Sequence, residues 1–167
     1  MSIPLRSPCY AEIEIDAPPA RVWAALCDLA AYPSWRCPFT ERMELQRPGG
    51  APLRASDVVV EHVRLSPRDS SVRLTPVRVT EAAPPGDGAG ARLCWDSVVG
   101  ARFLLHATRT QRLAPLDGGA RTLYTSEDVM TGLLRPLVLL LYGDAVRVGF
   151  EAMAAALKAH VEGAAPR

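Results

Sequence analysis

The sequence lacks an excess of charge of either sign: its 167 residues carry 19 Lys and Arg against 18 Asp and Glu. A net charge of +1 provides no global field for DNA, RNA or an acidic membrane, and we expect no nucleic-acid partner. Long hydrophobic runs are missing as well. The longest wholly apolar run, residues 137–142, has six residues, whereas roughly 20 are needed to span a bilayer. We therefore expect no integral membrane association.

Cysteine is sparse, and the four that occur, at positions 9, 27, 37 and 94, have no CxxC spacing. This pattern predicts neither a disulfide scaffold nor a zinc site, and His62, His106 and Cys94 are too scattered to indicate a metal. The first residues lack the charged-then-apolar pattern of a secretory signal, so we expect a cytoplasmic protein. No GxSxG element, phosphate loop or dinucleotide fingerprint occurs, and we predict no cofactor.

A chain of this length buries roughly 70% of the surface that its unfolded form exposes, so its core needs no disulfide bonds or bound metals. It contains no internal repeat and no linker long enough to separate two units. We therefore predict a single domain over residues 1–167.

The first third of the sequence predicts a strand followed by two short helices. Residues 10–16 alternate apolar and polar side chains, which is typical of a half-buried strand. Asp16 and two prolines then provide the start of a helix over residues 21–27. Residues 29–35, interrupted by Pro33, indicate a second short helix or turn. An extended segment over 39–45 and a turn at 48–50 follow.

The remainder predicts consecutive antiparallel strands and one long helix. Residues 66–70 resemble a hairpin connection, and residues 84–90 form a loop rich in Gly and Pro. The predicted strands cover residues 58–65, 72–80, 92–99, 102–113 and 121–130, and apolar side chains recur at helical spacing from about 136 to 161. This order predicts an α+β fold in which a curved antiparallel sheet of six to seven strands wraps around the C-terminal helix. A cavity between the sheet and the helix is the expected functional feature.

Four segments resemble the START-like helix-grip (SRPBCC) superfamily, which includes polyketide cyclases and dehydratases. They are residues 13–26, 29–35, 132–137 and 147–158, supported by Leu93-Cys-Trp and residues 117–121. The resemblance implies a deep apolar cavity for a small hydrophobic molecule, such as a polyketide, isoprenoid or lipid, and neither a metal nor a nucleotide. The commonest relatives continue Tyr-Pro-x-Trp with Asn-Pro-Phe, whereas Arg36-Cys-Pro-Phe stands here, so we expect a different cavity entrance.

Histidine is the first candidate for acid/base chemistry in such a cavity. His62 would face the cavity if its strand turns Val58 and Val60 inward. The other face of the strand, with Val59 and Val63, is equally apolar. The phase of the strand therefore stays open, and an exposed or structurally bonded His62 is the alternative that we favour.

Three further residues complete the catalytic candidates. His106 has the same ambiguity of phase, and an outward side chain is favoured. Arg73 would bind an enolate or carboxylate if it faced the cavity, although a solvated strand face is the simpler expectation. Tyr124 shares a strand face with Ser126 and Asp128, so the three would donate or accept hydrogen bonds to a ligand together, unless this is an outer polar face.

The predicted ligand-binding residues are mostly large side chains, because aromatic walls supply area and orientation for a flat or isoprenoid ligand. Ordinary core packing explains them equally well. The residues are Trp35, Trp95, Phe103, Asp128, Tyr142, Phe150 and Met153.

The leading functional hypothesis is an enzyme of secondary metabolism that binds a polyketide-like molecule and guides its cyclisation or dehydration. A non-catalytic carrier or sensor of a lipid or other hydrophobic ligand is the alternative. A protein-interaction module is a third reading, which would combine a large exposed apolar patch with a collapsed cavity. The sequence leaves homodimerisation open.

Overall fold

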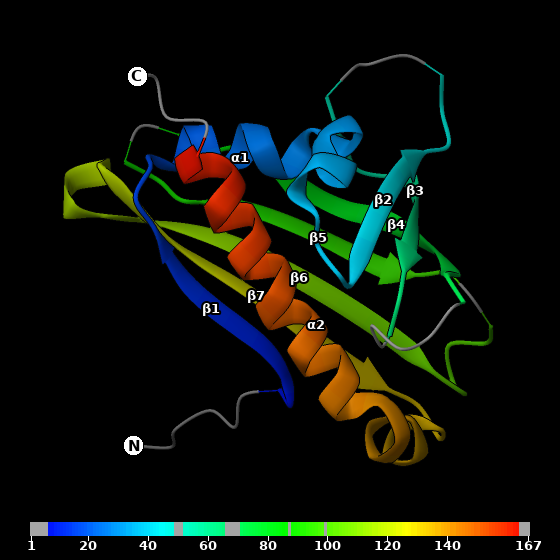
Figure 1. The fold of residues 1–167 in the computed structure, drawn as a ribbon. Helices are drawn as coiled ribbons and strands as arrows, with labels where there is room; N and C mark the ends of the chain where they lie inside the picture. The colour runs from blue at the N-terminus through cyan, green and yellow to red at the C-terminus, as the bar shows by residue number, and fades with distance from the viewer. Residues whose placement is uncertain (1–6, 49–51, 66–70, 87, 99, 164–167) are drawn as a thin grey trace.

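The computed structural model describes residues 7–48, 52–65, 71–86, 88–98 and 100–163. Seven strands form one sheet, and a long C-terminal helix crosses its concave face (Figure 1). The elements are β1 (Cys9–Ile15), α1 (Pro19–Cys27), a 3-10 helix (Leu29–Trp35), β2 (Thr40–Leu45), β3 (Val58–Val63), β4 (Arg73–Ala83), β5 (Ala91–Ser97), β6 (His106–Leu116), a short 3-10 turn (Asp117–Gly119), β7 (Arg121–Thr131) and α2 (Arg135–Gly163).

The strands follow the order β1-β7-β6-β5-β4-β3-β2, and every neighbouring pair is antiparallel. The first strand therefore pairs with the last one. This arrangement confirms the predicted α+β helix-grip fold, with its curved sheet, its two short helices after β1 and its long final helix. The predicted connection at 66–70 and part of the turn at 48–50 lie outside the described residues.

Two of the differences from the sequence prediction have a clear structural cause. β6 begins at His106 and not at residue 102, because the preceding residues form a turn in which the amides of Leu104 and Leu105 both donate to the carbonyl of Ala101. Asp16 does not cap α1: Pro18 occupies the N-cap position without a side-chain hydrogen bond. The amide of Asp16 instead donates to Glu162 Oε1 at 2.8 Å, which ties the start of α1 to the end of α2.

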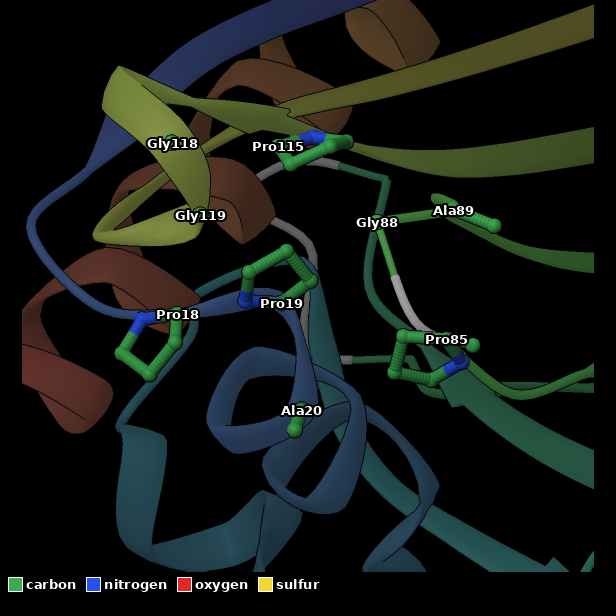
Figure 2. A pocket seen from close by; sticks show the side chains of 10 residues that line it. Pro18, Pro19, Ala20, Pro85, Gly88, Ala89, Pro115, Gly118 and Gly119 are labelled. Atoms are coloured by element: carbon green, nitrogen blue, oxygen red, sulfur yellow. The ribbon is translucent and has the colours of Figure 1, made fainter.

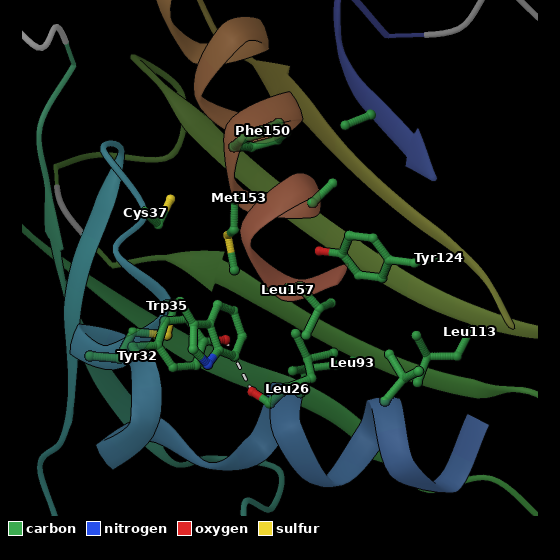
Figure 3. Close-up of a cluster of buried hydrophobic side chains, with 14 of the residues drawn as sticks. Leu26, Tyr32, Trp35, Cys37, Leu93, Leu113, Tyr124, Phe150, Met153 and Leu157 are labelled. Carbon is green, nitrogen blue, oxygen red and sulfur yellow. Dashed lines mark hydrogen bonds between the residues drawn. The ribbon is translucent and has the colours of Figure 1, made fainter. Parts of the chain in front are cut away.

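The core lies between the concave face of the sheet, α1 and the C-terminal half of α2 (Figure 3). Tyr32 and Trp35 stack with ring centroids 4.0 Å apart, and the Tyr32 hydroxyl donates to the carbonyl of Leu26 at 3.0 Å. Met153 and Leu157 of α2 are fully buried against these groups and the sheet. This end of the molecule is filled by side chains, so any internal space lies nearer the N-terminal half of α2.

Two glycines in α2 provide a matched test of packing. A Cβ at Gly149 would lie 2.1 Å from the ring of Phe39, whereas at Gly143 the nearest atom, in Leu139, is 3.8 Å away. We expect Gly149→Ala to lower the free energy of unfolding by about 1–3 kcal/mol, because the buried Phe39 ring must move. Gly143→Ala should instead raise it by up to about 1 kcal/mol through helix propensity. Urea unfolding measures both, and equal effects would contradict this packing.

Candidate functional site

A cavity of about 160 Å³ lies between the concave face of the sheet and α2. Its wall is mostly apolar but includes two carboxyl groups and one guanidinium. The lining residues come from the segment before β2, from β3 and the residue two beyond it, from β4 to β7 and from α2: Phe39, Glu61, Val63, Leu65, Thr75, Val77, Trp95, Ser97, Ala107, Arg109, Asp128, Met130, Val146 and Phe150.

Arg109 of β6 occupies the centre of this wall and is only 5% exposed. Its guanidinium carbon lies 4.1 Å from the ring centroid of Phe150 and 5.6 Å from that of Trp95, both within the range of cation–π attraction. Its Nε donates to Ser126 Oγ at 3.0 Å, and one terminal nitrogen donates to Met153 Sδ at 3.0 Å. The other terminal nitrogen lies 3.7 Å from Glu61 Oε1. These contacts fix a positive charge inside an apolar cavity.

Glu61 of β3 faces the cavity together with Val63, because alternate residues of a strand point to the same side. The pKa of Glu61 is raised from its ordinary 4.5 to about 7, because the raising effects of burial, the largest cause, and of the nearby Asp128 together exceed the lowering effect of Arg109. Among the described residues, Oε1 accepts no hydrogen bond. A carboxyl with this pKa exchanges its proton near neutral pH, as acid/base catalysis requires.

Asp128 of β7 lies directly opposite Arg109 in the strand register. Its pKa is raised from the ordinary 3.8 to about 6, because the raising effect of burial exceeds the lowering effects of Arg109 and His106. Its buried Oδ1 has no hydrogen-bond partner in the described part of the chain. Buried oxygens of this kind are costly unless a water molecule or a ligand donates to them. The cavity therefore presents two acceptor groups to whatever occupies it.

Tyr124 lies deeper on the same face of β7 and is fully buried. Its hydroxyl donates to Gln111 Oε1 at 2.6 Å, and burial raises its pKa. Tyr124, Ser126 and Asp128 therefore do share one face, as the sequence pattern predicts, and this face is the concave one. The alternative of an outer polar face is wrong, although Tyr124 itself belongs to the core beneath the cavity and does not line it.

The structure places both histidine candidates on the opposite side of their strands from Glu61 and Arg109. His62 lies 3.5 Å from Glu44 of β2, and His106 lies 3.4 Å from Asp96 of β5. Neither lines the cavity. A cavity-facing His62 or His106 is thus excluded by the phase of β3 and β6, and the outward alternative holds.

Arg73 lies on the concave side of β4, but at the exposed start of the strand. Its guanidinium carbon is 5.4 Å from the ring centroid of Tyr142. Tyr142 is half-buried on α2. Neither residue lines the cavity, so the predicted binding roles of both lack direct contact with it. Their contact joins β4 to α2 across the end of the sheet.

Among the predicted ligand-binding residues, Trp95, Asp128 and Phe150 line the cavity. Met153 lies beneath it, in contact with Arg109. Trp35 packs in the core against Tyr32, and Phe103 is 68% exposed in the turn before β6. The last two are therefore not part of the cavity wall. Glu61 and Arg109 are cavity residues that the sequence pattern did not predict. Only Glu61 carried a signal, as a lone acidic residue in phase with Val59 and Val63.

A second, larger hollow of about 550 Å³ lies at the other end of the sheet (Figure 2). Its described lining contains no titratable side chain and consists of Pro18, Pro19, Ala20, Pro85, Gly86, Gly88, Ala89, Pro115, Gly118 and Gly119. In the described ranges, no three His, Cys, Asp or Glu side chains are grouped to hold a metal. This hollow therefore offers no acid or base, whereas the smaller cavity is lined by Glu61, Arg109 and Asp128.

A known protein family matches most of this chain. The sequence profile of the family described as polyketide cyclase / dehydrase and lipid transport matches residues 9–162. The protein belongs to this family. The family match covers the whole sheet and nearly all of α2, including the strands that carry Glu61, Arg109 and Asp128. No curated protein sequence matches the chain.

Solved structures similar to this polyketide cyclase/dehydrase family member share its fold at low sequence identity. A hypothetical protein from Helicobacter pylori has a TM-score of 0.72 at 14% identity, over 95% of this chain and 91% of that one. Norcoclaurine synthase from Thalictrum flavum has a TM-score of 0.63 at 12% identity, over 95% and 87%. An aromatase/cyclase from Streptomyces sp. R1128 has a TM-score of 0.57 at 19% identity, over 92% of both chains.

Proposed function

We propose that the protein binds a small, mostly hydrophobic carbonyl compound in the cavity and promotes its cyclisation or dehydration by acid/base catalysis. The observation that carries this proposal is the buried set of Glu61, Arg109 and Asp128, one cation between two carboxyls whose pKa values are raised to about 7 and about 6. A purely structural cavity has no need of three desolvated charged groups, since replacing them by apolar residues is often neutral or stabilising.

The two pKa values assign the acid and the base between about pH 6 and 7, where Asp128 is the more ionised carboxyl and Glu61 the more protonated one. Asp128 removes a proton from the carbon beside the substrate carbonyl. Arg109 binds the carbonyl oxygen and stabilises the enolate that forms. Its ring contacts and its bond to Ser126 hold it in place without reorganisation.

The enolate then has two outcomes that use the same residues. In a dehydration it forms the carbon–carbon double bond and expels the β-hydroxyl, which takes the proton of Glu61 and leaves as water. In a cyclisation the enolate carbon bonds to a second carbonyl carbon, and the oxygen of that carbonyl takes the proton. Asp128 ends protonated and Glu61 ionised in both, and proton exchange with solvent restores the starting state.

The volume of the cavity limits the part of the substrate that it can enclose. About 160 Å³ is close to the volume of a cavity that holds benzene, so the site accommodates one ring. The similar norcoclaurine synthase structure was determined with dopamine and hydroxybenzaldehyde, both of which are single-ring aromatics. A longer substrate would extend through the half-exposed residues Ser97, Ala107 and Met130.

The test uses a minimal probe, the aldol adduct of acetone and benzaldehyde, whose dehydration gives a conjugated, strongly absorbing enone. We expect the protein to accelerate this reaction and native mass spectrometry to detect the bound probe. Ala107→Phe, which fills the half-exposed mouth, should abolish both signals. The matched control is Thr108→Phe on the opposite face of β6, which should keep both. Binding without turnover would contradict catalysis and favour the carrier alternative.

A further inference from the structure

Exposed hydrophobic side chains gather at the end of the sheet where the N-terminal half of α2 begins. We call seven of them the apolar platform: Phe103, Leu104, Leu133, Leu134, Leu137, Leu140 and Leu141. Their exposed fractions run from 38% for Leu104 to 82% for Leu140. Scattered surface leucines are normal, whereas apolar side chains grouped on neighbouring segments are typical of interaction sites.

The platform is built from two chain segments that the backbone ties together. The amide of Leu133 donates to the carbonyl of Phe103 at 3.0 Å, and the amide of Leu134 donates to that of Leu104 at 2.8 Å. Gly132 permits this approach: its φ is +106°, and a Cβ there would lie 2.6 Å from the Leu104 oxygen. The backbone therefore fixes the two segments relative to each other, and the platform continues into the first turns of α2 (Figure 1).

The platform borders the mouth of the cavity. Ala107 of β6 and Met130 of β7 are half-exposed residues of the cavity wall and lie opposite each other in the sheet. Leu104 precedes Ala107 by three residues, and Leu133 follows Met130 by three. The other half-exposed wall residues, such as Thr75 and Ser97, stand at the same ends of β4 and β5. A ligand that passes through the mouth therefore passes beside the platform.

The balanced net charge of the chain conceals a local excess of positive charge at this end. Arg102 and Arg135 lie within the platform segments, and Arg73 stands across the mouth; all three are exposed. Residues 100–107 and 129–143 contain no Asp or Glu. Acidic residues border this region: Asp96 lies 3.6 Å from Arg102, Glu127 and Asp128 line one hollow with Arg135, and Asp144 follows the platform on α2.

We propose that the apolar platform docks on an anionic lipid bilayer, so that the cavity mouth opens against the membrane. Exposed leucines flanked by arginines are the chemistry of interfacial binding: the leucines enter the acyl boundary and the arginines pair with anionic headgroups. Two copies packed by this surface would bring arginines together, and an acidic protein partner would leave most of the leucines without a match. No helix in the described part of the chain is long and apolar enough to cross a bilayer.

Sedimentation with phosphatidylcholine vesicles, with and without phosphatidylglycerol, tests the docking. We expect binding to the anionic vesicles that weakens at high salt. Leu137→Asp with Leu140→Asp should weaken it about tenfold or more, and each of Arg102→Glu and Arg135→Glu at least about fivefold, because each reverses a charge. The matched control Arg78→Glu, an exposed arginine in the middle of β4, should have no effect. Leu140→Trp should show a blue shift of its fluorescence on the anionic vesicles.

Three results would overturn the docking: no sedimentation with anionic vesicles, equal weakening by Arg78→Glu, or no fluorescence shift for Leu140→Trp. A concentration-dependent dimer that Leu137→Asp dissociates would assign the platform to a second copy instead. The proposal does not rest on the acid/base function, because vesicle binding is measured without turnover. Loss of vesicle binding in a variant that still dehydrates the aldol probe would separate the two.

Discussion

Arg109→Met is expected to lower the free energy of unfolding by about 3–5 kcal/mol at about pH 8, as the loss of one partner from a buried ion pair typically does. Methionine keeps part of the apolar stem of Arg109 but lacks the guanidinium that lies over the rings of Phe150 and Trp95. It removes the only cation placed against Glu61 and Asp128 among the described residues of the cavity wall. Two desolvated carboxylates then remain without compensation. Urea unfolding at several pH values measures the effect.

The pH dependence distinguishes this cause from a packing defect. Without the cation, the pKa values of Glu61 and Asp128 rise further, and the variant regains stability as the pH falls and both carboxyls take protons. The double variant Arg109→Met with Glu61→Gln should recover part of the lost free energy of unfolding at about pH 8, because only one buried carboxylate, that of Asp128, then remains without a cation. A loss that is the same at about pH 5 and pH 8 would contradict the electrostatic explanation.

Glu61→Gln is expected to lower kcat for dehydration of the aldol probe by about 100- to 10,000-fold, the range that general acid/base catalysis contributes. Glutamine has nearly the shape of glutamate but has no proton to deliver to the departing hydroxyl. In the protein with Glu61, the rate should be highest between about pH 6 and 7, since the reaction requires one ionised and one protonated carboxyl. The variant should lose the fall on the alkaline side.

Stability measurements separate this loss of rate from loss of fold. The pKa of Glu61 is higher in the folded chain than its ordinary 4.5, so its contribution is fully favourable below about pH 4.5 and is lost as the pH rises through about 7. Glu61→Gln removes this dependence, and the variant should be no less stable than the protein with Glu61 at about pH 8. His62→Gln, one position along β3 and on its other face, should leave kcat unchanged. Equal rates for Glu61→Gln and the protein with Glu61 would exclude the acid role.

The fold follows from the sequence because its signals are redundant. Each element has its own signal: alternation in β1, prolines at the start of α1 and helical spacing in α2. The order of these elements then predicts the architecture. The site depends on strand phase, for which the signals conflict. In β3, Val58 and Val60 on one face are as apolar as Val59 and Val63 on the other, so the pattern could not tell His62 from Glu61 as the inward residue.

The other differences between the predicted and the observed cavity residues also arise from tertiary structure. Arg109 is one of 18 arginines, and only the neighbourhood that the fold creates, with Trp95 beside it and Phe150 from α2, sets it apart. Trp95, Asp128 and Phe150 do line the cavity, and their role in binding a ligand stays a prediction. Phe103 was predicted to line the cavity, but the turn that delays the start of β6 places it outside.

The pairing of β1 with β7 also determines when the protein can fold during synthesis. Cys9 lies opposite Asp128, so the N-terminal strand has no partner until most of the chain has left the ribosome. Pairing over such a sequence separation closes a large loop and is slow to form. The growing chain holds an edge strand and an uncovered concave face until α2 emerges after β7. We expect this protein to depend on chaperones during translation more than helical proteins of equal length do.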